Sequence, residues 1–427
     1  MLTDPAPDTG PVRAESRDAA LQRQRTITRF AGLSLVWLCV FSSGFVLREP
    51  APFDLMMVPL IAGGFLIGGL RFYPQQAPGF ILMILFIAGG LISMTQATVF
   101  GHVPLYMAVS AFLVGTYMFF ASLIAGDVRT IRVLRTAYIA SAVVVALIGI
   151  LGYFHAIPGS ESFTLYNRAK GTFEDPNVFG PFLIFPIGLL VHDFLTEPLR
   201  RTIRFVPFLL ILLFGVFLSF SRAAWGMTLF TCLSLTLIVF LKDPRPVVRL
   251  RIIGIATAGA VLLVVGLGVA LSFDAVSDLF AERAKLVQPY DSARYGRFAR
   301  YSHGFAMAFE APLGIGPMQF RNYFPEDPHN IYMKSLLDYG WLGGFSYIAF
   351  TLWTLVRGFP LLFRGREWSP FYRAAYVVFV AHVLCGIIID TDHWRHLFML
   401  YGFVWGCFAL AARERAAGQA MPQKAPS

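Results

Sequence analysis

The chain has 427 residues, of which 56% are hydrophobic and only 14% are charged, and its mean hydropathy is +0.63. Soluble globular domains do not reach this apolar content, so the composition excludes a soluble fold and predicts a polytopic membrane protein. The formal net charge is +10, but the basic residues gather in alternate loops and both tails, a distribution typical of membrane topology rather than nucleic-acid binding.

A membrane-spanning helix needs about 20 mostly apolar residues, and the sequence contains twelve stretches of roughly that length. They are residues 30–47, 53–70, 79–98, 103–124, 137–155, 178–195, 205–219, 224–241, 252–273, 340–356, 374–390 and 396–412. Because Arg and Lys accumulate in every second connection and in both tails, the positive-inside rule predicts an even number of spans and two cytoplasmic termini.

The predicted organisation follows from these spans. In order, we expect a disordered basic cytoplasmic tail (1–29), nine spans (30–273), a long periplasmic loop (274–339), three spans (340–412) and a second cytoplasmic tail (413–427). No small-residue cleavage site follows the first apolar run, so the first span is predicted to be an uncleaved signal anchor. If the membrane is a bacterial inner membrane, the long loop faces the periplasm. All four cysteines fall within spans, which argues against disulfides and thiolate metal sites.

The loop before the sixth span carries the first candidate site. Asp175 is a suitable N-cap and Pro176 suits the first helical position, so a helix with free backbone N–H groups should begin here. Such a helix start attracts anions, and Arg168 and Lys170 add positive charge beside it. On spacing alone, simple contact between these two basic residues and lipid headgroups explains them equally well.

A second candidate lies in the tight hairpin between the seventh and eighth spans. There Arg222 follows two hydroxyl residues, Ser219 and Ser221. An arginine at the end of a span either extends its charge to the membrane surface or binds an anion, and its position alone does not distinguish these roles. The planar guanidinium group suits phosphate because it donates two parallel hydrogen bonds and stays charged.

Residues 273–343 are the only long hydrophilic interruption of the chain, and we interpret them as a lid and half of the active site. The pattern predicts an amphipathic helix from about residue 295 through Phe309, followed by a break at residues 311–317. The Gly314-x-Gly316 pair follows no predicted strand, so it does not indicate a dinucleotide site. Arg297 and Arg300 are weaker candidates for contacts with phosphate or an acceptor.

The end of this loop repeats the earlier pattern. Residues 326–330 (Glu-Asp-Pro-His-Asn) resemble residues 174–177 (Glu-Asp-Pro-Asn), which predicts a second helix start facing the same compartment. His329 would then lie in the first helical turn, where the positive end of the helix dipole favours a neutral imidazole that can accept a proton. For a single histidine, a purely structural role is the alternative.

The last outer loop, residues 390–396, contains several groups that can bind metals. An H-x-x-H pair without a further fixed ligand is a weak metal signal, so we expect a solvated polar loop instead. His382, within the eleventh span, is expected to make hydrogen bonds in helix packing.

Several of these segments, taken in order, resemble the O-antigen ligase and polymerase superfamily. They are Arg168-x-x-Gly171-x-Phe173-x-Asp175-Pro176-Asn177, Ser221-Arg222, Pro312-Leu313-Gly314-Ile315-Gly316, His329-Asn330-x-Tyr332 and Gly340-Trp341-Leu342-Gly343. The resemblance extends from about Tyr153 to Ala411, and the earlier spans agree only in number and hydropathy.

The resemblance implies an all-α glycosyltransferase of the GT-C kind with about twelve spans and no metal or other cofactor. Members of the family take a glycan from undecaprenyl diphosphate at the periplasmic face and transfer it to an acceptor hydroxyl, and we expect inversion. The acceptor is the lipid A core in ligases, another repeat unit in polymerases, and a protein in related members. The family's functional arginines correspond to Arg168 and Arg222, and its histidine to His329. Asp338 stands where family members often have Glu.

These assignments predict that Arg168 and Arg222, together with helix N-termini, stabilise the departing diphosphate and that His329 is the general base. Further substrate-binding candidates are Lys170, Asn177, Asn330, Arg297, Arg300 and Asp338. The expected partners are the lipid-linked donor, a lipid A core or glycan acceptor, and membrane lipids, with no nucleic acid.

Two other classes of membrane protein are alternatives to a glycosyltransferase. A lipid-linked sugar flippase or transporter usually carries ionisable groups near the midplane or repeated halves, and the sequence has no evident half-repeat. A membrane scaffold would not need arginines paired with helix starts on one face. Among the enzymes, a ligase is favoured over a polymerase, although acceptor choice depends on loop shape.

Overall fold

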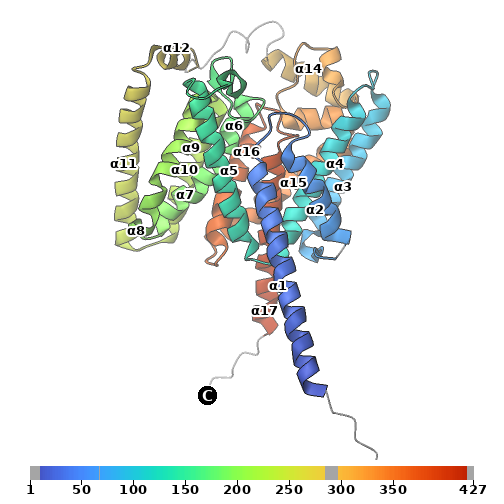
Figure 1. The fold of residues 1–427 in the computed structure, drawn as a ribbon. Coiled ribbons are helices and arrows are strands. Elements are labelled where there is room, and N and C mark those ends of the chain that lie inside the picture. Colours follow the sequence, from blue (N-terminus) through green and yellow to red (C-terminus); the bar gives the residue numbers. More distant parts are fainter. Residues whose placement is uncertain (1–9, 67, 284–296, 421–427) are drawn as a thin grey trace, which may run out of the picture.

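The computed structural model describes residues 10–66, 68–283 and 297–420, which are mostly helical (Figure 1). The main helices are α1 (Gly10–Ser42), α2 (Pro52–Leu66), α3 (Ala77–Ser93), α4 (Val103–Gly126), α5 (Thr130–Tyr153), α6 (Pro176–Phe182), α7 (Ile184–Thr196), α8 (Leu199–Thr202), α9 (Val206–Leu218), α10 (Arg222–Lys242), α11 (Pro246–Ala270), α12 (Asp274–Arg283), α14 (Arg297–Glu310), α15 (Ile331–Gly358), α16 (Ser369–Cys385) and α17 (Arg395–Ala420). Two short strands, β1 (Thr164–Leu165) and β2 (Arg168–Ala169), pair antiparallel.

Among the described residues, nine helical segments are long and apolar enough to cross a membrane. Helices α6 and α7 together form one of these nine segments. The shorter apolar helices α2 and α16 and the second half of α1 coincide with the other three predicted spans. The chain is therefore an all-α polytopic membrane protein, as its composition predicts. The count of twelve spans and their orientation in the membrane stay predictions.

The start of α1 and the end of α17 lie at the same end of the helices, as an even number of spans requires (Figure 1). We call the opposite end, where α6 and α10 begin and where α12 and α14 lie, the distal end. The described residues of the predicted loop 274–339 therefore lie at the end remote from both tails. Its predicted amphipathic helix is α14.

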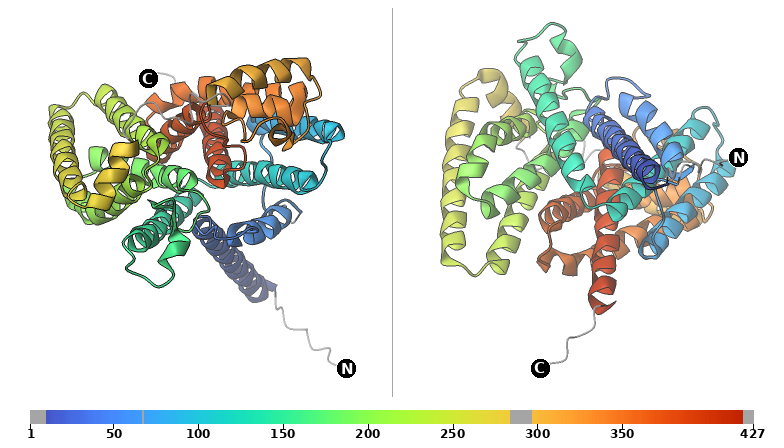
Figure 2. Two further views of the ribbon diagram at one scale, coloured as in Figure 1. Left: turned by 90° about the horizontal axis from the view of Figure 1, so that it is seen from above. Right: turned by 60° about the horizontal axis from the view of Figure 1, so that its bottom comes forward.

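The helices form two groups joined near the middle of the molecule (Figure 2). In one, α3 packs along α15 and α4 packs along α17, while in the other α5, α7, α9 and α10 pack together. Helix α16 contacts α7, α10 and α17 and so connects the groups. Helix α11 lies at the edge, where only 6% of its most apolar stretch is buried.

Helix α15 is broken at Gly340, whose φ of +64° and ψ of −176° are not helical. The turn at residues 312–316 fills this break, because the Trp341 N–H donates to the Pro312 carbonyl at 2.8 Å. In the same way, the Ile315 N–H donates to the Leu337 carbonyl at 2.8 Å. The turn thus satisfies backbone groups that the break exposes, and it holds the first part of α15 at the distal end.

Gly340→Ala is expected to destabilise the fold strongly. Its backbone conformation is accessible almost only to glycine and costs other residues about 1–3 kcal/mol. An added Cβ would also lie 2.8 Å from the Leu313 carbonyl carbon. Thermal unfolding of the detergent-solubilised protein measures the effect, with Gly259→Ala as the control because a Cβ there meets nothing within 4 Å. Equal stability of the two variants would contradict this role for the break.

Candidate functional site

Arg168 is buried, with only 6% of its surface exposed, at the start of β2. The preceding residues Tyr166 and Asn167 have positive φ and turn the chain back so that the two strands can pair. Arg168 Nε donates to the Ser219 carbonyl at 2.8 Å, and its Nη2 donates to Asn177 Oδ1 at 2.8 Å. One guanidinium group therefore joins β2 to the start of α6 and to the residues before α10.

Both segments that Arg168 contacts lead into helix starts. Asp175 caps α6 by accepting a hydrogen bond from the Asn177 N–H at 2.6 Å, as its position predicts. Ser221 caps α10 by accepting from the Ala224 N–H at 3.4 Å. We call Arg168, Asn177, Ser219, Ser221 and Arg222 the arginine cluster. Arg222 is the first residue of α10 and is partly exposed, and Lys170 follows β2 closely, also partly exposed.

The prediction that His329 lies in the first turn of a helix is wrong. Helix α15 begins at Ile331, and Asn330 is its N-cap, accepting from the Tyr332 and Met333 N–H groups at 3.1 and 3.0 Å. His329 precedes the cap with a φ of +53°. A side-chain acceptor at Asn330 satisfies the free N–H groups of the helix, so the cap falls one residue after the histidine and the helix starts two residues after it.

Asp327 does not cap this helix either, contrary to the comparison with Asp175. Its carboxylate accepts a hydrogen bond from Arg321 Nε at 3.0 Å. Burial acts to raise the pKa of Asp327, but the hydrogen bond and charge of Arg321 outweigh it and lower the pKa. Arg321, six residues earlier in the chain, therefore binds the carboxylate that the sequence pattern assigned to capping.

His329 lies between two carboxylates. Its Nδ1 is 3.9 Å from Asp390 Oδ2 and its Nε2 is 3.9 Å from Glu326 Oε2, while 37% of the side chain is exposed. The His329 backbone N–H donates to the same Asp390 oxygen at 3.1 Å, which fixes that carboxylate against the ring. We call these three residues the histidine cluster. Burial raises the pKa of Asp390 to about 6.

The expectation of a solvated loop at residues 390–396 is wrong. Thr391, Asp392 and His396 are at most 5% exposed. Asp392 accepts a hydrogen bond from the Tyr106 hydroxyl and forms an ion pair with Lys334 at 3.3 Å. Burial acts to raise the pKa of Asp392, but the charge of Lys334 contributes to an opposing effect that lowers it to about 2. The loop is part of the packed interior because its charges have partners.

Sequence reasoning missed the group formed by Tyr106, Lys334 and Asp392. The Tyr106 hydroxyl also donates to Asp338 Oδ2 at 3.1 Å, so α4, α15 and the loop after α16 meet here. No short-range pattern relates residues separated by more than 200 positions. Lys334, a charge in the helical segment that leads into the apolar stretch 340–356, is the one local signal. Within the described ranges, no group of three or more His, Cys, Asp or Glu side chains could hold a metal ion.

Replacing Lys334 with Met is expected to destabilise the protein by about 3–5 kcal/mol, because it leaves the buried Asp392 carboxylate without its cation. The double variant Lys334→Met/Asp392→Asn should recover much of this loss. Thermal unfolding of both variants measures the effect, and Asp243→Asn in an exposed ion pair should change little. A Lys334→Met protein as stable as the parent would show that the ion pair does not hold the loop.

The other predicted site residues have mainly structural contacts. Arg300 is 2% exposed and pairs with Glu326 at 2.8 Å, so it positions a carboxylate of the histidine cluster. Asn330 caps α15 and donates to the Ile387 carbonyl at 3.0 Å, and Asp338 is buried against Tyr106. Arg297 begins α14, but its side chain lies outside the described residues.

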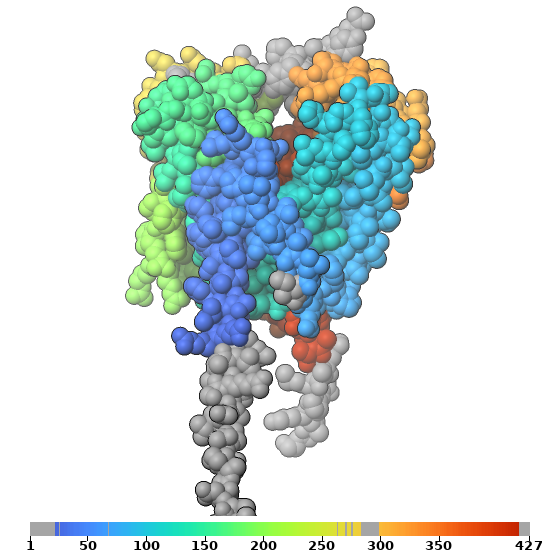
Figure 3. Space-filling model, turned by 45° about the vertical axis from the view of Figure 1, so that its right-hand side comes forward, coloured from blue at the N-terminus to red at the C-terminus, as the bar shows by residue number. Residues whose placement is uncertain are grey.

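The arginine and histidine clusters lie at the same distal end of the molecule, beside α6 and α10 and beside α14 and α15 respectively (Figure 1). The space-filling view is hollowed at this end, between the green segment that leads into α6 and the cyan and orange segments of the other group (Figure 3). The molecular surface thus leaves room between the two groups of helices on the side where both clusters are found.

Residues 207–348 match a protein-family model described as O-antigen ligase. The matched range runs from α9 into α15, so it contains Arg222, His329 and Asp338, whereas Arg168, Lys170 and Asn177 precede it. None of the curated proteins compared with the chain matches it.

Proposed function

From the premise that the match supports the O-antigen ligase superfamily, and with it a ligase- or polymerase-type membrane enzyme, we propose that this protein transfers a glycan from undecaprenyl diphosphate to an acceptor hydroxyl. The reaction would take place at the periplasmic face of a bacterial inner membrane, with lipid A core as the favoured acceptor. The observation that carries the proposal is the contact of Arg168 with both Asn177 and Ser219, which brings two helix N-termini and two arginines together.

The arginine cluster supplies what a diphosphate leaving group needs. When the bond between the sugar and the diphosphate breaks, the leaving oxygen takes the bonding electrons and its negative charge must be stabilised. Arg222 is the partly exposed guanidinium of the cluster, and the starts of α6 and α10 add backbone N–H groups and the positive ends of two helix dipoles. Arg168, being buried, holds these elements together and adds its charge.

The histidine cluster supplies the base. The His329 imidazole takes the proton of the acceptor hydroxyl while the hydroxyl oxygen attacks the anomeric carbon, and the diphosphate leaves from the opposite face. This single displacement inverts the configuration at that carbon. Asp390 and Glu326, each 3.9 Å from a ring nitrogen, stabilise the positive charge that the imidazole gains, as a carboxylate does beside a catalytic histidine.

A reconstituted assay tests the proposal. Purified protein is mixed with undecaprenyl-diphosphate glycan, with or without lipid A core, and the products are separated on a gel. Glycan on lipid A core supports the ligase, and longer glycan ladders without that acceptor would instead indicate a polymerase, the runner-up. If neither product forms although the donor binds, the proposal fails and a flippase or transporter becomes the better hypothesis.

Glycan transfer is expected to be unaffected by EDTA. Arginines and helix N-termini carry the charge stabilisation in this mechanism, so it needs no divalent cation. The assay is repeated after dialysis against EDTA, with and without added Mg²⁺, using equal amounts of folded protein. Loss of transfer that Mg²⁺ restores would contradict the mechanism.

A further inference from the structure

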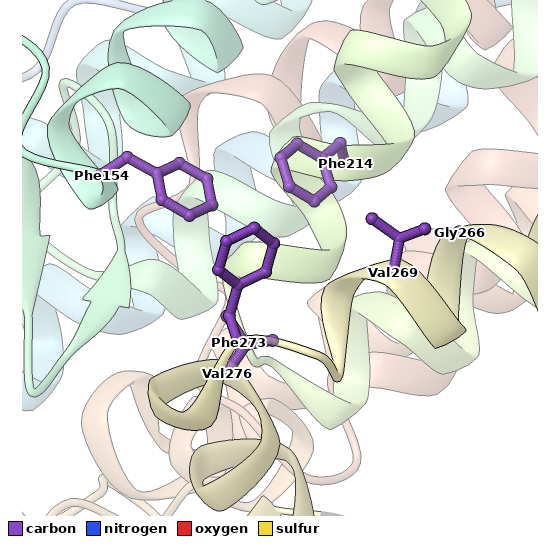
Figure 4. Close-up of a pocket in the computed structure, with 6 residues that line it drawn as sticks. All are labelled: Phe154, Phe214, Gly266, Val269, Phe273 and Val276. Atoms are coloured by element: carbon purple, nitrogen blue, oxygen red, sulfur yellow. The ribbon is translucent and has the colours of Figure 1, made fainter.

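An apolar cavity of about 290 Å³ lies between the distal ends of α5, α9 and α11 and the start of α12 (Figure 4). Its lining is Phe154, Phe214, Gly266, Val269, Phe273 and Val276, which present no polar side chain to it. The rings of Phe154, Phe214 and Phe273 face the same open space in Figure 4. The ring centroid of Phe154 is 6.2 Å from that of Phe214 and 6.1 Å from that of Phe273.

A row of aromatic rings runs from this cavity to the arginine cluster. Phe214, Phe217 and Phe220 are three residues apart, and their successive ring centroids are separated by 6.3 and 5.7 Å. Phe220 directly precedes Ser221, the N-cap of α10. Phe214 lies in the last turns of α9, which ends at Leu218, and Ser221 follows three residues later. The cavity and the site proposed for the diphosphate are therefore joined by the end of one helix and a short turn.

The row is partly covered from the distal side and open toward the membrane. Phe280 of α12 lies over it, with its ring centroid 6.2 Å from that of Phe217. Helix α11 packs on α7 and α10 near its start, where Val248 and Ile252 are buried, but at the cavity Val269 is 58% exposed. A chain that lies in the bilayer could thus enter the cavity beside α11 without crossing a polar surface.

We propose that the cavity and the aromatic row bind the isoprenoid chain of the lipid-linked donor. The isoprene units nearest the diphosphate would lie on Phe217, which is partly exposed, and the following units would enter the cavity beside Phe214. Phe220 is 1% exposed, so it supports the row from behind and does not contact the lipid itself. Methyl branches and double bonds pack well on aromatic faces, and the aromatic row leads from the end of α9 beside the arginine cluster to the cavity, as a chain that continues directly from a bound diphosphate requires. This inference rests on the proposed function, because it assigns a place to the lipid of the same donor.

Photo-crosslinking tests the site without requiring transfer. The full-length protein in detergent or nanodiscs is labelled with a benzophenone-bearing isoprenyl diphosphate, and the labelled peptides are identified by mass spectrometry. We expect label in the peptides of α9, α11 and α12, reduced at least about tenfold by excess undecaprenyl diphosphate but little by a phospholipid. Label elsewhere, or equal competition by phospholipid, would overturn the inference and make the cavity a surface for bilayer lipid.

Kinetics with two donors test it independently. Phe214→Ala and the cavity-filling Val269→Trp should raise KM for a long-chain donor by about tenfold and leave KM for a donor with one or two isoprene units unchanged. Phe208→Ala is the matched control, since Phe208 is on the same helix but is exposed and lies outside the cavity lining. Equal changes with both donors, or none, would overturn the inference. Absence of transfer by the parent protein together with specific crosslinking would contradict the proposed function alone.

Discussion

His329→Ala is expected to lower kcat for glycan transfer about 10²- to 10⁴-fold, which is the contribution typical of a positioned general base. Donor binding and the unfolding temperature should change little, because the ring is 37% exposed and the local backbone is held by the His329 N–H and carbonyl groups. The measurement is the rate of transfer to lipid A core at saturating donor, together with donor binding. His102→Ala, at an exposed histidine that begins another helix, is the control.

The carboxylates beside His329 give this prediction a second test. Asp390→Asn keeps the shape of the side chain but removes the charge that faces Nδ1, so it should lower kcat less than His329→Ala and leave KM for the donor unchanged. If His329→Ala transfers glycan at nearly the parent rate, the histidine is not the base. The role would then have to be sought among the other groups at the distal end.

Arg222→Lys is expected to reduce transfer by about 10²-fold or more, although it keeps the positive charge. A lysine offers a point charge in place of the two parallel donors of the guanidinium group, and loss of one well-placed donor to a developing oxyanion costs about 10²- to 10³-fold. The rate of transfer and KM for the donor are measured together. Arg132→Lys, an exposed arginine near the start of α5 at the opposite end of the molecule, is the control.

The outcome for Arg222 separates two roles that its position in the sequence leaves open. Full activity of Arg222→Lys would mean that the residue only anchors the end of α10 at the membrane surface, where either cation suffices. A large fall in kcat with normal unfolding would instead support contact with the leaving diphosphate in the transition state.

Local features of the sequence predicted much of the fold. Helices coincide with all twelve apolar stretches, because the length and composition of a span are properties of contiguous residues. Asp175 caps α6 as predicted, since a cap and the N–H groups it satisfies are only two or three residues apart. The resemblance that joined Ser221-Arg222 to His329 is supported by the family match over residues 207–348.

The sequence by itself thus determined the helical membrane fold, the common side of the two tails and the segments that carry the candidate site. Only the tertiary structure decided how those residues are held: Arg168 on the Ser219 carbonyl, His329 beside Asp390, and Lys334 on Asp392. Three expectations were wrong: His329 within a helix, Asp327 as its cap, and a solvated loop at 390–396. The first two failed at short range, because Asn330 is the cap and Arg321 binds Asp327. The loop failed at long range, because Lys334 and Tyr106, more than 50 residues away, satisfy the buried Asp392, and such distant contacts override local preference.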